Sequence, residues 1–472
     1  DVNLGIHVLT CQVFVADGVT LTIQPGAVVY AEPVSANFVE PAVCDAASCT
    51  ADNECIFVDG SCQGFTSTLV VLQGGKLNAA GTAENPITFT PNLPAARLVA
   101  EDLANPDPEV DYSTGALAAS VRGWWGGLII LGRANIKGDT RSIEGLSTPL
   151  PYGGTDDNDS SGVLQYVRVW YGGARIAADN EINGITFGGV GAGTIVDHCE
   201  VAFNVDDGFE FFGGNVNAKY LSTLFVGDDA FDTDKGYTGK LQYIYAMLGS
   251  SGHHAAEMDA DYGNAERSAP QVMGATFIGS ASQGLGHDTM MRLREGTGGA
   301  FGNMVIAKKN GIPGIRHDRC FASSAREPGT VSGETTTQTR PGDVQAALPN
   351  TLFISPTLVI ADVDDAPDFD ERCDGSLQSM TNVASDPMFN DVPGTPDEMT
   401  LSCIKPGWDA GRSNCGFAPT LMIIADNTDF NFPGWFSGET RYDGTMTSEY
   451  DCQAACAALD GCDYFSYEWE TS

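Results

Sequence analysis

Two stretches of this chain repeat each other at an interval of 22 residues (228 − 206). Laying Thr194–Gly214 over Val216–Gly236 places Cys199 on Leu221, Val201 on Thr223, Phe203 on Phe225, Asp206 and Asp207 on Asp228 and Asp229, Phe209 on Phe231, Glu210 on Asp232 and Gly214 on Gly236. This period is too short for a pair of helices or for a propeller blade, which needs about 40 residues. It therefore predicts a solenoid whose coils are built from short strands.

Further strand-like runs lie on both sides of the repeat. Leu164–Val169 matches Val196–Val201 at an offset of 32 (196 − 164), which predicts a coil with an inserted turn containing Ile182–Gly189. The other runs are Val19–Ile23, Leu69–Leu72, Leu128–Leu131, Leu241–Tyr245, Val272–Ile278 and Met304–Ile306. Each is rich in β-branched or aromatic residues, as strands are. We expect an all-β protein, a parallel β-helix; a two-sheet sandwich is the alternative, with turn signals every ~8–12 residues.

The composition limits the partners of the chain. Lysine and arginine number 24 against 62 aspartate and glutamate, giving a formal charge of −38, which excludes attraction to nucleic acid or an anionic membrane. Partners should be neutral, cationic or bridged by calcium. The sequence has no apolar run of about 18 residues, the length that would predict a membrane span. The chain begins at Asp1 without Met, and we expect a mature extracellular protein whose signal peptide has been removed.

Thirteen cysteines also indicate a secreted protein. Cys44, Cys49, Cys55 and Cys62 lie in a segment, residues 40–65, that we expect to be a loop insertion held by two disulfides. A zinc site is the alternative, although no histidine lies there. Cys373, Cys403 and Cys415 are further expected disulfide cysteines, whereas Cys11 and Cys320 are scattered. Cys199 should be a buried thiol, because it occupies the inward position of Leu221.

The last part of the chain has a different character. Cys452, Cys456 and Cys462 precede an aromatic run, Tyr464–Tyr467, and this pattern resembles the first half of a PAN/Apple domain, an extracellular adhesion module. We therefore expect a β-helix over residues 1–425 and a small cysteine-rich module over 426–472, with one disulfide among the three cysteines. A stapled cap on the solenoid is the alternative. Four aromatic residues at the start of this segment are expected to take part in assembly: Phe430, Phe432, Trp435 and Phe436.

The repeat stacks carboxylates about 5 Å apart along the solenoid axis, the spacing of neighbouring strands. Like charges at this distance require hydrogen bonds or a cation, and calcium takes six to eight oxygen ligands. The expected calcium ligands are Asp206, Asp207, Glu210, Asp228, Asp229, Asp232 and Asp234. Capping of solvent-facing turns by aspartate is the alternative.

No catalytic motif of an established kind is present, so we expect that the chain is not an enzyme. The histidines show no ligand spacing beyond the adjacent pair His253 and His254. Arg292 and Arg294 are expected to form ion pairs that stabilise a turn. The alternative is a carbohydrate-binding or carbohydrate-active lyase or hydrolase, which needs a groove lined by exposed aromatic residues. The candidates are Trp124, Trp125, Trp170 and Tyr171, although at least one of the first two should lie in the core.

Several strings are similar to a family of secreted, right-handed β-helix surface proteins of bacteria and algae, over roughly residues 15–425: Trp125–Gly132, Tyr152–Gly154, Asp206–Gly214, Asp228–Asp234 and Arg294–Gly298. The cysteine loop and the tail make the chain more similar to the algal members, which include proteins of flagellar hairs, the mastigonemes. The resemblance implies a structural glycoprotein of an extracellular filament or flagellar appendage, which polymerises with itself or with related β-helix subunits through its ends. Glycans are further expected partners, and the resemblance implies no catalytic residues.

Overall fold

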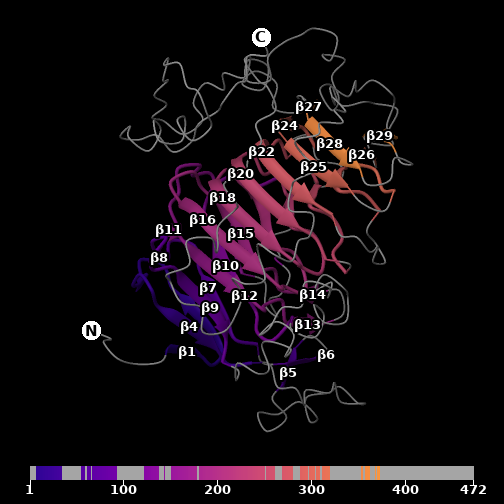
Figure 1. Cartoon of the computed structure of the whole chain (residues 1–472). Helices are drawn as coiled ribbons and strands as arrows, with labels where there is room; N and C mark the ends of the chain where they lie inside the picture. Colours follow the sequence, from indigo (N-terminus) through magenta and orange to yellow (C-terminus); the bar gives the residue numbers. More distant parts are fainter. Residues whose placement is uncertain are drawn as a thin grey trace.

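The structure is a computed structural model of the 472-residue chain. It describes residues 7–33, 55–58, 61–64, 66–92, 122–137, 143, 150–177, 180–249, 251–260, 268–279, 288–295, 297–302, 304–308, 311–318, 352–354, 357–361, 367 and 369–372. All regular elements within these ranges are β-strands, and no helix among them could cross a membrane. Most of the strands form two long parallel sheets (Figure 1).

Sheet A has fifteen strands. They are β1 (His7–Leu9), β3 (Thr20–Ile23), β4 (Val28–Ala31), β8 (Lys76–Ala80), β9 (Ile87–Pro91), β11 (Gly162–Gln165), β12 (Val167–Trp170), β16 (Ile195–Ala202), β18 (Asn217–Leu224), β20 (Lys240–Met247), β22 (Gln271–Ile278), β24 (Gly299–Gly302), β25 (Met304–Lys308), β27 (Leu352–Ile354) and β28 (Thr357–Ala361).

Sheet B has ten strands, in the same order along the axis as along the chain. They are β2 (Gln12–Val15), β7 (Thr68–Val71), β10 (Leu128–Leu131), β15 (Ile185–Val190), β17 (Phe209–Gly214), β19 (Phe231–Asp234), β21 (Ala256–Met258), β23 (Met291–Leu293), β26 (Ile315–His317) and β29 (Phe369–Glu371). Two antiparallel hairpins stand apart from both sheets: β5 (Cys55–Val58) with β6 (Ser61–Gly64), and β13 (Arg175–Ala177) with β14 (Asn180–Glu181).

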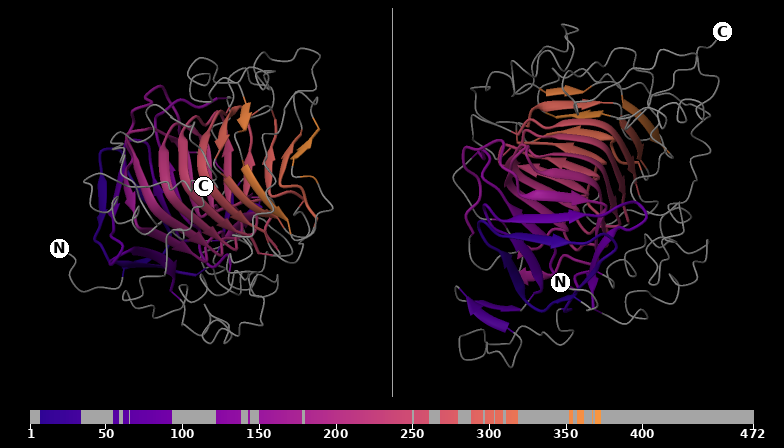
Figure 2. Two further views of the ribbon diagram at one scale, coloured as in Figure 1. Left: turned by 45° about the horizontal axis from the view of Figure 1, so that its top comes forward. Right: turned by 90° about the vertical axis from the view of Figure 1, so that its left-hand side faces the viewer.

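Each coil contributes strands to both sheets, and each of these pairs in parallel with its equivalent in the next coil (Figure 2). The chain runs from β16 in sheet A to β17 in sheet B and then to β18 and β19. Cys199 pairs with Leu221, and Glu210 pairs with Asp232. The predicted parallel β-helix and its 22-residue register are therefore confirmed.

The coils bury their inward residues against each other, and equivalent aromatic rings stack. The rings of Phe209 and Phe231 lie 5.5 Å apart at 6°, and Phe203 and Phe225 also stack at 5.5 Å. All four are fully buried, as predicted. Phe203 and Phe225 occupy the left-handed region (φ 55° and 53°), so this second ladder stabilises a turn whose backbone is unfavourable for a phenylalanine.

The 32-residue coil is confirmed, because Leu164 pairs with Val196 and Val169 with Val201. The predicted position of its inserted turn is wrong. Residues 185–190 form β15, a regular strand of sheet B, whereas the β13–β14 hairpin departs from the sheets just before it. The sequence predicts a turn at Ile182–Gly189 because glycines often form the corners of coils. Gly188 instead lies within β15, where a Cβ atom would lie 2.5 Å from Ile143 Cδ1.

Among the described residues, Cys11 and Cys199 are free thiols. Cys199 is buried, as predicted, and burial raises its pKa to about 12. Cys55 and Cys62 lie on the β5–β6 hairpin, where the structure gives the strands but no side-chain positions. The other predicted disulfide and assembly residues lie outside the described ranges: Cys44, Cys49, Cys373, Cys403, Cys415, Cys452, Cys456, Cys462, Phe430, Phe432, Trp435 and Phe436.

The outer face of sheet B is covered at its N-terminal end. Val70 on β7 and Ile129 and Leu131 on β10 point outward and would be exposed if they were uncovered. Instead they form a second apolar cluster with Ile143 and Tyr152, which lie beyond β10 in the chain. The polar part of the sheet begins where this cover ends.

Candidate functional site

One outward row of sheet B changes from apolar to acidic to basic along the solenoid axis. Strand pairing places its members side by side in the order Phe14, Val70, Ile129, Thr186, Glu210, Asp232, Glu257, Arg292, Arg316 and Asp370. Because outward positions of a parallel β-helix do not fill the core, this sequence of charges is free to serve another purpose.

We call the outer face over β17 and β19 the acidic half. It contains Asp206, Asp207, Glu210, Asp228, Asp229, Asp232 and Asp234. The face over β23, β26 and β29 is the arginine half, which contains Arg292, Arg294, Arg316 and Arg372, and the carboxylates of Glu257, Asp259, Asp288, Asp318 and Asp370 lie against them. Strand β21 and the turn before it separate the two halves.

Carboxyl groups crowd together in the acidic half. Oxygen atoms of Asp207, Glu210 and Asp232 lie within 4.8 Å of one another, as do those of Asp206, Asp207 and Asp228. Burial, and then the charge of Asp206, raises the pKa of Asp207 well above its usual range. Burial, and then the charge of Asp259, does the same for Asp232. For both groups, crowding with other carboxyl groups adds to burial in favouring the protonated form.

Asp232 and Asp234 lie two residues apart on the same face of β19, and both are half-buried. Asp232 Oδ1 is buried without a hydrogen-bond partner. Asp234 is an ion-pair partner of Lys235, whose Nζ lies 3.1 Å from Asp234 Oδ2. A carboxyl group with a raised pKa and an ion-paired carboxylate thus stand next to each other on one strand.

In the arginine half Arg292, Arg294 and Arg316 each contact two carboxylates, and Arg372 contacts Asp370. Arg292 donates to both oxygens of Asp318 at 3.1 and 3.0 Å, and its Nη1 lies 3.6 Å from Glu257. Arg316 contacts Asp288 and, at 3.1 Å, Asp370. The ion pairs predicted for Arg292 and Arg294 are therefore present, although they join successive coils rather than the ends of one turn.

Arg294 shares its charge between Glu257 and Asp259, whose carboxylates both lie 2.6 Å from its Nη2. One guanidinium cannot neutralise two buried carboxylates. Burial, reinforced by Asp229, raises the pKa of Glu257 to about 8, and burial raises that of Asp259 to about 7 although Arg294 opposes it. The pKa of Arg294 lies above its usual range, because hydrogen bonds to Asp259 outweigh burial.

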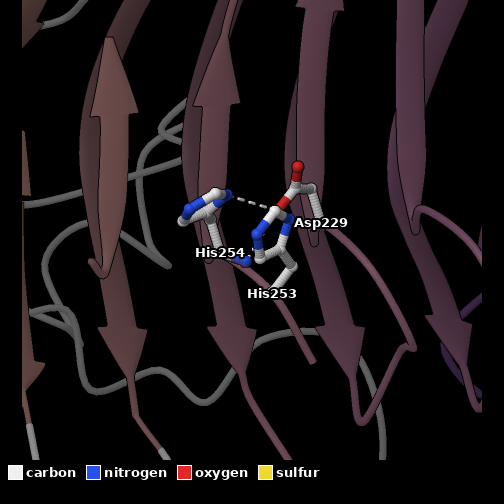
Figure 3. A group of neighbouring side chains, drawn as sticks. All are labelled: Asp229, His253 and His254. Atoms are coloured by element: carbon white, nitrogen blue, oxygen red, sulfur yellow. Dashed lines mark hydrogen bonds and ion pairs between the residues drawn. The ribbon is translucent and has the colours of Figure 1, made fainter. Parts of the chain in front are cut away.

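The turn before the sheet B strand carries the pair Asp206–Asp207 in one coil, Asp228–Asp229 in the next and His253–His254 in the third. Figure 3 shows both imidazole rings beside the Asp229 carboxylate. His254 Nδ1 lies 2.8 Å from Asp229 Oδ1, and its Nε2 lies 3.0 Å from Asp288 Oδ1. Burial opposes a charge on His254, but Asp229 and Asp288 outweigh it and raise the pKa of His254 to about 10.

Six of the seven predicted calcium ligands lie in groups of side chains whose ligand atoms are within 4.8 Å of one another. Among the described residues, Asp234 belongs to no such group. The hydrogen bonds in place also suit turn capping, since Asp207 Oδ1 accepts from Asp229 N at 2.9 Å. Calcium stays a prediction. Sequence reasoning missed Glu257 and the histidine pair. The signal for the pair was its place in the column, 25 residues after Asp228 (253 − 228).

The predicted aromatic groove is wrong for three of its residues. Trp125 lies in the core, as expected for one of the two adjacent tryptophans, and Trp170 and Tyr171 are 7% and 1% exposed. Trp170 Nε1 donates to Glu200 Oε1 at 2.8 Å, so its polar edge is satisfied inside the protein. These rings cannot form a platform for sugar.

A family model described as a pectate-lyase-like β-helix domain matches residues 112–342, a little under half of the chain. The match contains the acidic half and most of the arginine half. No curated protein and no solved structure is similar enough to be matched. The match agrees with the observed parallel β-helix. It contradicts the expectation that the chain is not an enzyme, because the domain it names is lyase-like.

Proposed function

We propose that this protein is a carbohydrate-active β-helix protein that binds a polysaccharide along the outer face of sheet B and hydrolyses it there. The observation that carries the proposal is the pair Asp232 and Asp234 on one strand of the matched domain. Parallel strands and their turns repeat at every coil, so a chain of sugar units would meet several of them in succession.

The two carboxyl groups have the properties of an acid and a base. Glycosidases that invert the anomeric centre hold their carboxyl groups about 6.5–9.5 Å apart, with room for a water. Outward residues two positions apart on a strand are separated by about 6.6 Å. Asp232, whose pKa is raised by burial, would protonate the leaving oxygen, and Asp234 would accept a proton from the attacking water.

Hydrolysis fits this face better than elimination. A lyase needs an unprotonated base to remove a proton beside a uronate carboxylate. Arg292 and Arg294 are occupied by carboxylates, and these partners raise their pKa further, against the effect of burial. A guanidinium held in this way can serve neither as the base nor as the counter-charge of a uronate.

The charge of the protein indicates the substrate class. A chain with a formal charge of −38 and an acidic site repels a polyanion. We therefore assign a neutral or amino-sugar polysaccharide. Calcium fits the oxygen-only group of Asp206, Asp207 and Asp228, where it would offset the repulsion among these carboxylates.

The role of filament subunit inferred from the resemblance stays a prediction, as do the extracellular location and the partner subunits. The domain match favours action on carbohydrate over polymerisation, because a lyase-like domain is a catalytic one. Both roles need the same solenoid.

The test is an assay of the full chain on neutral, amino-sugar and uronate polysaccharides, read by released reducing ends and by proton NMR of the new anomeric centre. We expect inverted products from a neutral or amino-sugar polymer. Asp232→Asn and Asp234→Asn should each lower the rate by at least about 100-fold, whereas Asp370→Asn, at the far end of the same face, should leave it unchanged. Unsaturated products, or equal rates for all three variants, would contradict the assignment.

A further inference from the structure

Asp229, His253 and His254 each offer a ligand atom within 4.8 Å of the others where the aspartate column meets the histidine pair, and Asp228 lies beside His253. His253 Nδ1 lies 2.8 Å from Asp228 Oδ1 and 3.7 Å from Asp229 Oδ1, and His254 Nδ1 lies 2.8 Å from Asp229 Oδ1. A tetrahedral zinc ion with bonds of about 2.0–2.1 Å holds neighbouring ligand atoms roughly 3.3 Å apart. Two of the three separations are shorter than that value and one is longer, so side-chain rotations are needed for all four residues to reach one ion.

The His254 ring is oriented as the ring of a metal-bound histidine is. Such a histidine usually donates its second ring N–H to a carboxylate, which fixes the ring and raises its basicity. His254 Nε2 lies 3.0 Å from Asp288 Oδ1, and Arg316 holds Asp288 in turn through its side chain and its backbone carbonyl. This support lies outside the four ligands and is independent of the acidic cluster.

A positive charge is required between His254 and Asp229. With its Nε2–H directed to Asp288, a neutral ring would present the Nδ1 lone pair to Asp229 Oδ1 at 2.8 Å, and two acceptors at this distance repel each other. Asp229 already accepts from the His254 backbone N–H at 2.6 Å. A metal ion bound at Nδ1 would remove this repulsion while the Nε2–H stays on Asp288.

We propose that Asp228, Asp229, His253 and His254 bind a divalent ion of the zinc class. Two imidazole nitrogens distinguish this site from the oxygen-only groups beside it, because imidazole suits zinc and its transition-metal neighbours, whereas calcium takes oxygen ligands. The side chains of His253 and Asp228 are 31% and 47% exposed, so an ion can enter from solvent and keep one side open. The buried side chains of Asp229 and His254 determine how far below the surface the ion would lie.

The ion need not take part in carbohydrate cleavage, and the test does not depend on it. The full chain is freed of metal with a chelator, dialysed and titrated with ZnCl2 by calorimetry, and Co²⁺ is then used as a spectroscopic substitute. We expect one zinc ion per chain and the intense visible absorption of tetrahedral cobalt. A tenfold excess of Ca²⁺ should leave the zinc in place.

Three variants locate the site. His253→Ala should weaken zinc binding at least tenfold, and Asp288→Asn should weaken it about 10- to 100-fold through the ring orientation. Both change partly exposed side chains, so neither leaves a buried cavity. His198→Ala is the matched control, because that histidine pairs with Asp197 on sheet A, and it should bind zinc like the wild type. Absence of stoichiometric zinc, displacement by calcium, or wild-type affinity of His253→Ala would overturn the proposal.

Discussion

The two halves of the sheet B face have the same backbone but differ in how their charged side chains are paired. In the arginine half, every guanidinium of Arg292, Arg294 and Arg316 contacts two carboxylates. In the acidic half, carboxyl groups lie within 4.8 Å of each other; Lys235 pairs with Asp234, and the histidine pair contacts Asp228 and Asp229. The carboxylates of the arginine half therefore face guanidinium groups, whereas those of the acidic half mostly face one another.

This difference distinguishes charged groups that stabilise the fold from charged groups that serve a function. A paired buried charge costs little when its partner is present and much when the partner is removed. Crowded carboxyl groups cost free energy as they stand and are retained when a ligand or a reaction needs them. We therefore interpret the arginine half as the structural part of the face and the acidic half as the part that meets a ligand.

The largest effect is expected from removing the shared guanidinium. Arg294→Met leaves Asp259 buried without its counter-charge and removes the nearer of the two guanidinium groups beside Glu257, which should lower the free energy of unfolding by about 3–5 kcal/mol. Lys235→Met in the acidic half removes a more exposed pair and should cost less than about 1 kcal/mol. Urea unfolding of both variants measures the difference. Equal losses would show that the two halves do not differ in this way.

Matched amide substitutions should have opposite signs in the two halves. Asp318→Asn weakens the two contacts with Arg292 and should cost about 1–3 kcal/mol. Asp232→Asn should stabilise the protein by about 1–2 kcal/mol at pH 7, because the amide removes one carboxyl from the crowded, buried group with Asp207 and Glu210. Thermal unfolding of the pair gives the signs. A loss of stability in Asp232→Asn would remove the argument for like-charge crowding.

The pH dependence should reveal the surplus of carboxylates around Arg294. The folded pKa of Asp259, about 7, lies above its ordinary value of 3.8, so folding takes up a proton between these values. The contribution of this proton to stability is complete below about pH 4 and is lost as the pH rises through about 7. Asp259→Asn lacks this loss, so its melting temperature should rise relative to the wild type from pH 4 to pH 8. A constant difference would contradict the raised pKa.

The smallest effect is expected from calcium. Calcium should raise the melting temperature by a few degrees through Asp206, Asp207 and Asp228, in line with about 1 kcal/mol of ligand linkage at a few times the dissociation constant. Asp207→Asn should abolish the increase, and Asp370→Asn in the arginine half should leave it intact. If EDTA and calcium leave the melting curve unchanged, the aspartate column serves only as turn caps.

The sequence was sufficient for the coil and for its register, because identical residue types at a fixed interval can only stack. Glu210 over Asp232 and Phe209 over Phe231 followed directly from the 22-residue period. The column could not be followed to His253 and His254, since the next coil is three residues longer (25 − 22) and the residue type changes from acid to imidazole. At this coil both the length of the repeat and the type of residue change.

The rest of the site depends on burial and on lateral partners, which one sequence does not encode locally. Burial raises the pKa of Glu257 and Asp259 and nearby carboxylates add to the rise, whereas Arg294, a residue of the following coil, opposes it. Trp170 looked available for sugar, but its ring is covered and bonded to Glu200. The resemblance implied a structural role without catalytic residues, whereas the matched domain is lyase-like. The absence of a known catalytic motif in the sequence therefore does not show an absence of catalysis.

The central claim, that the acidic half is kept for function at a cost in stability, is tested most directly by measuring polysaccharide hydrolysis and the melting temperature on the same Asp232→Asn protein. The account predicts that hydrolysis is lost while the melting temperature rises, since the amide cannot donate the proton but relieves the crowding. Hydrolysis at the wild-type rate, or a fall of both quantities together, would contradict it.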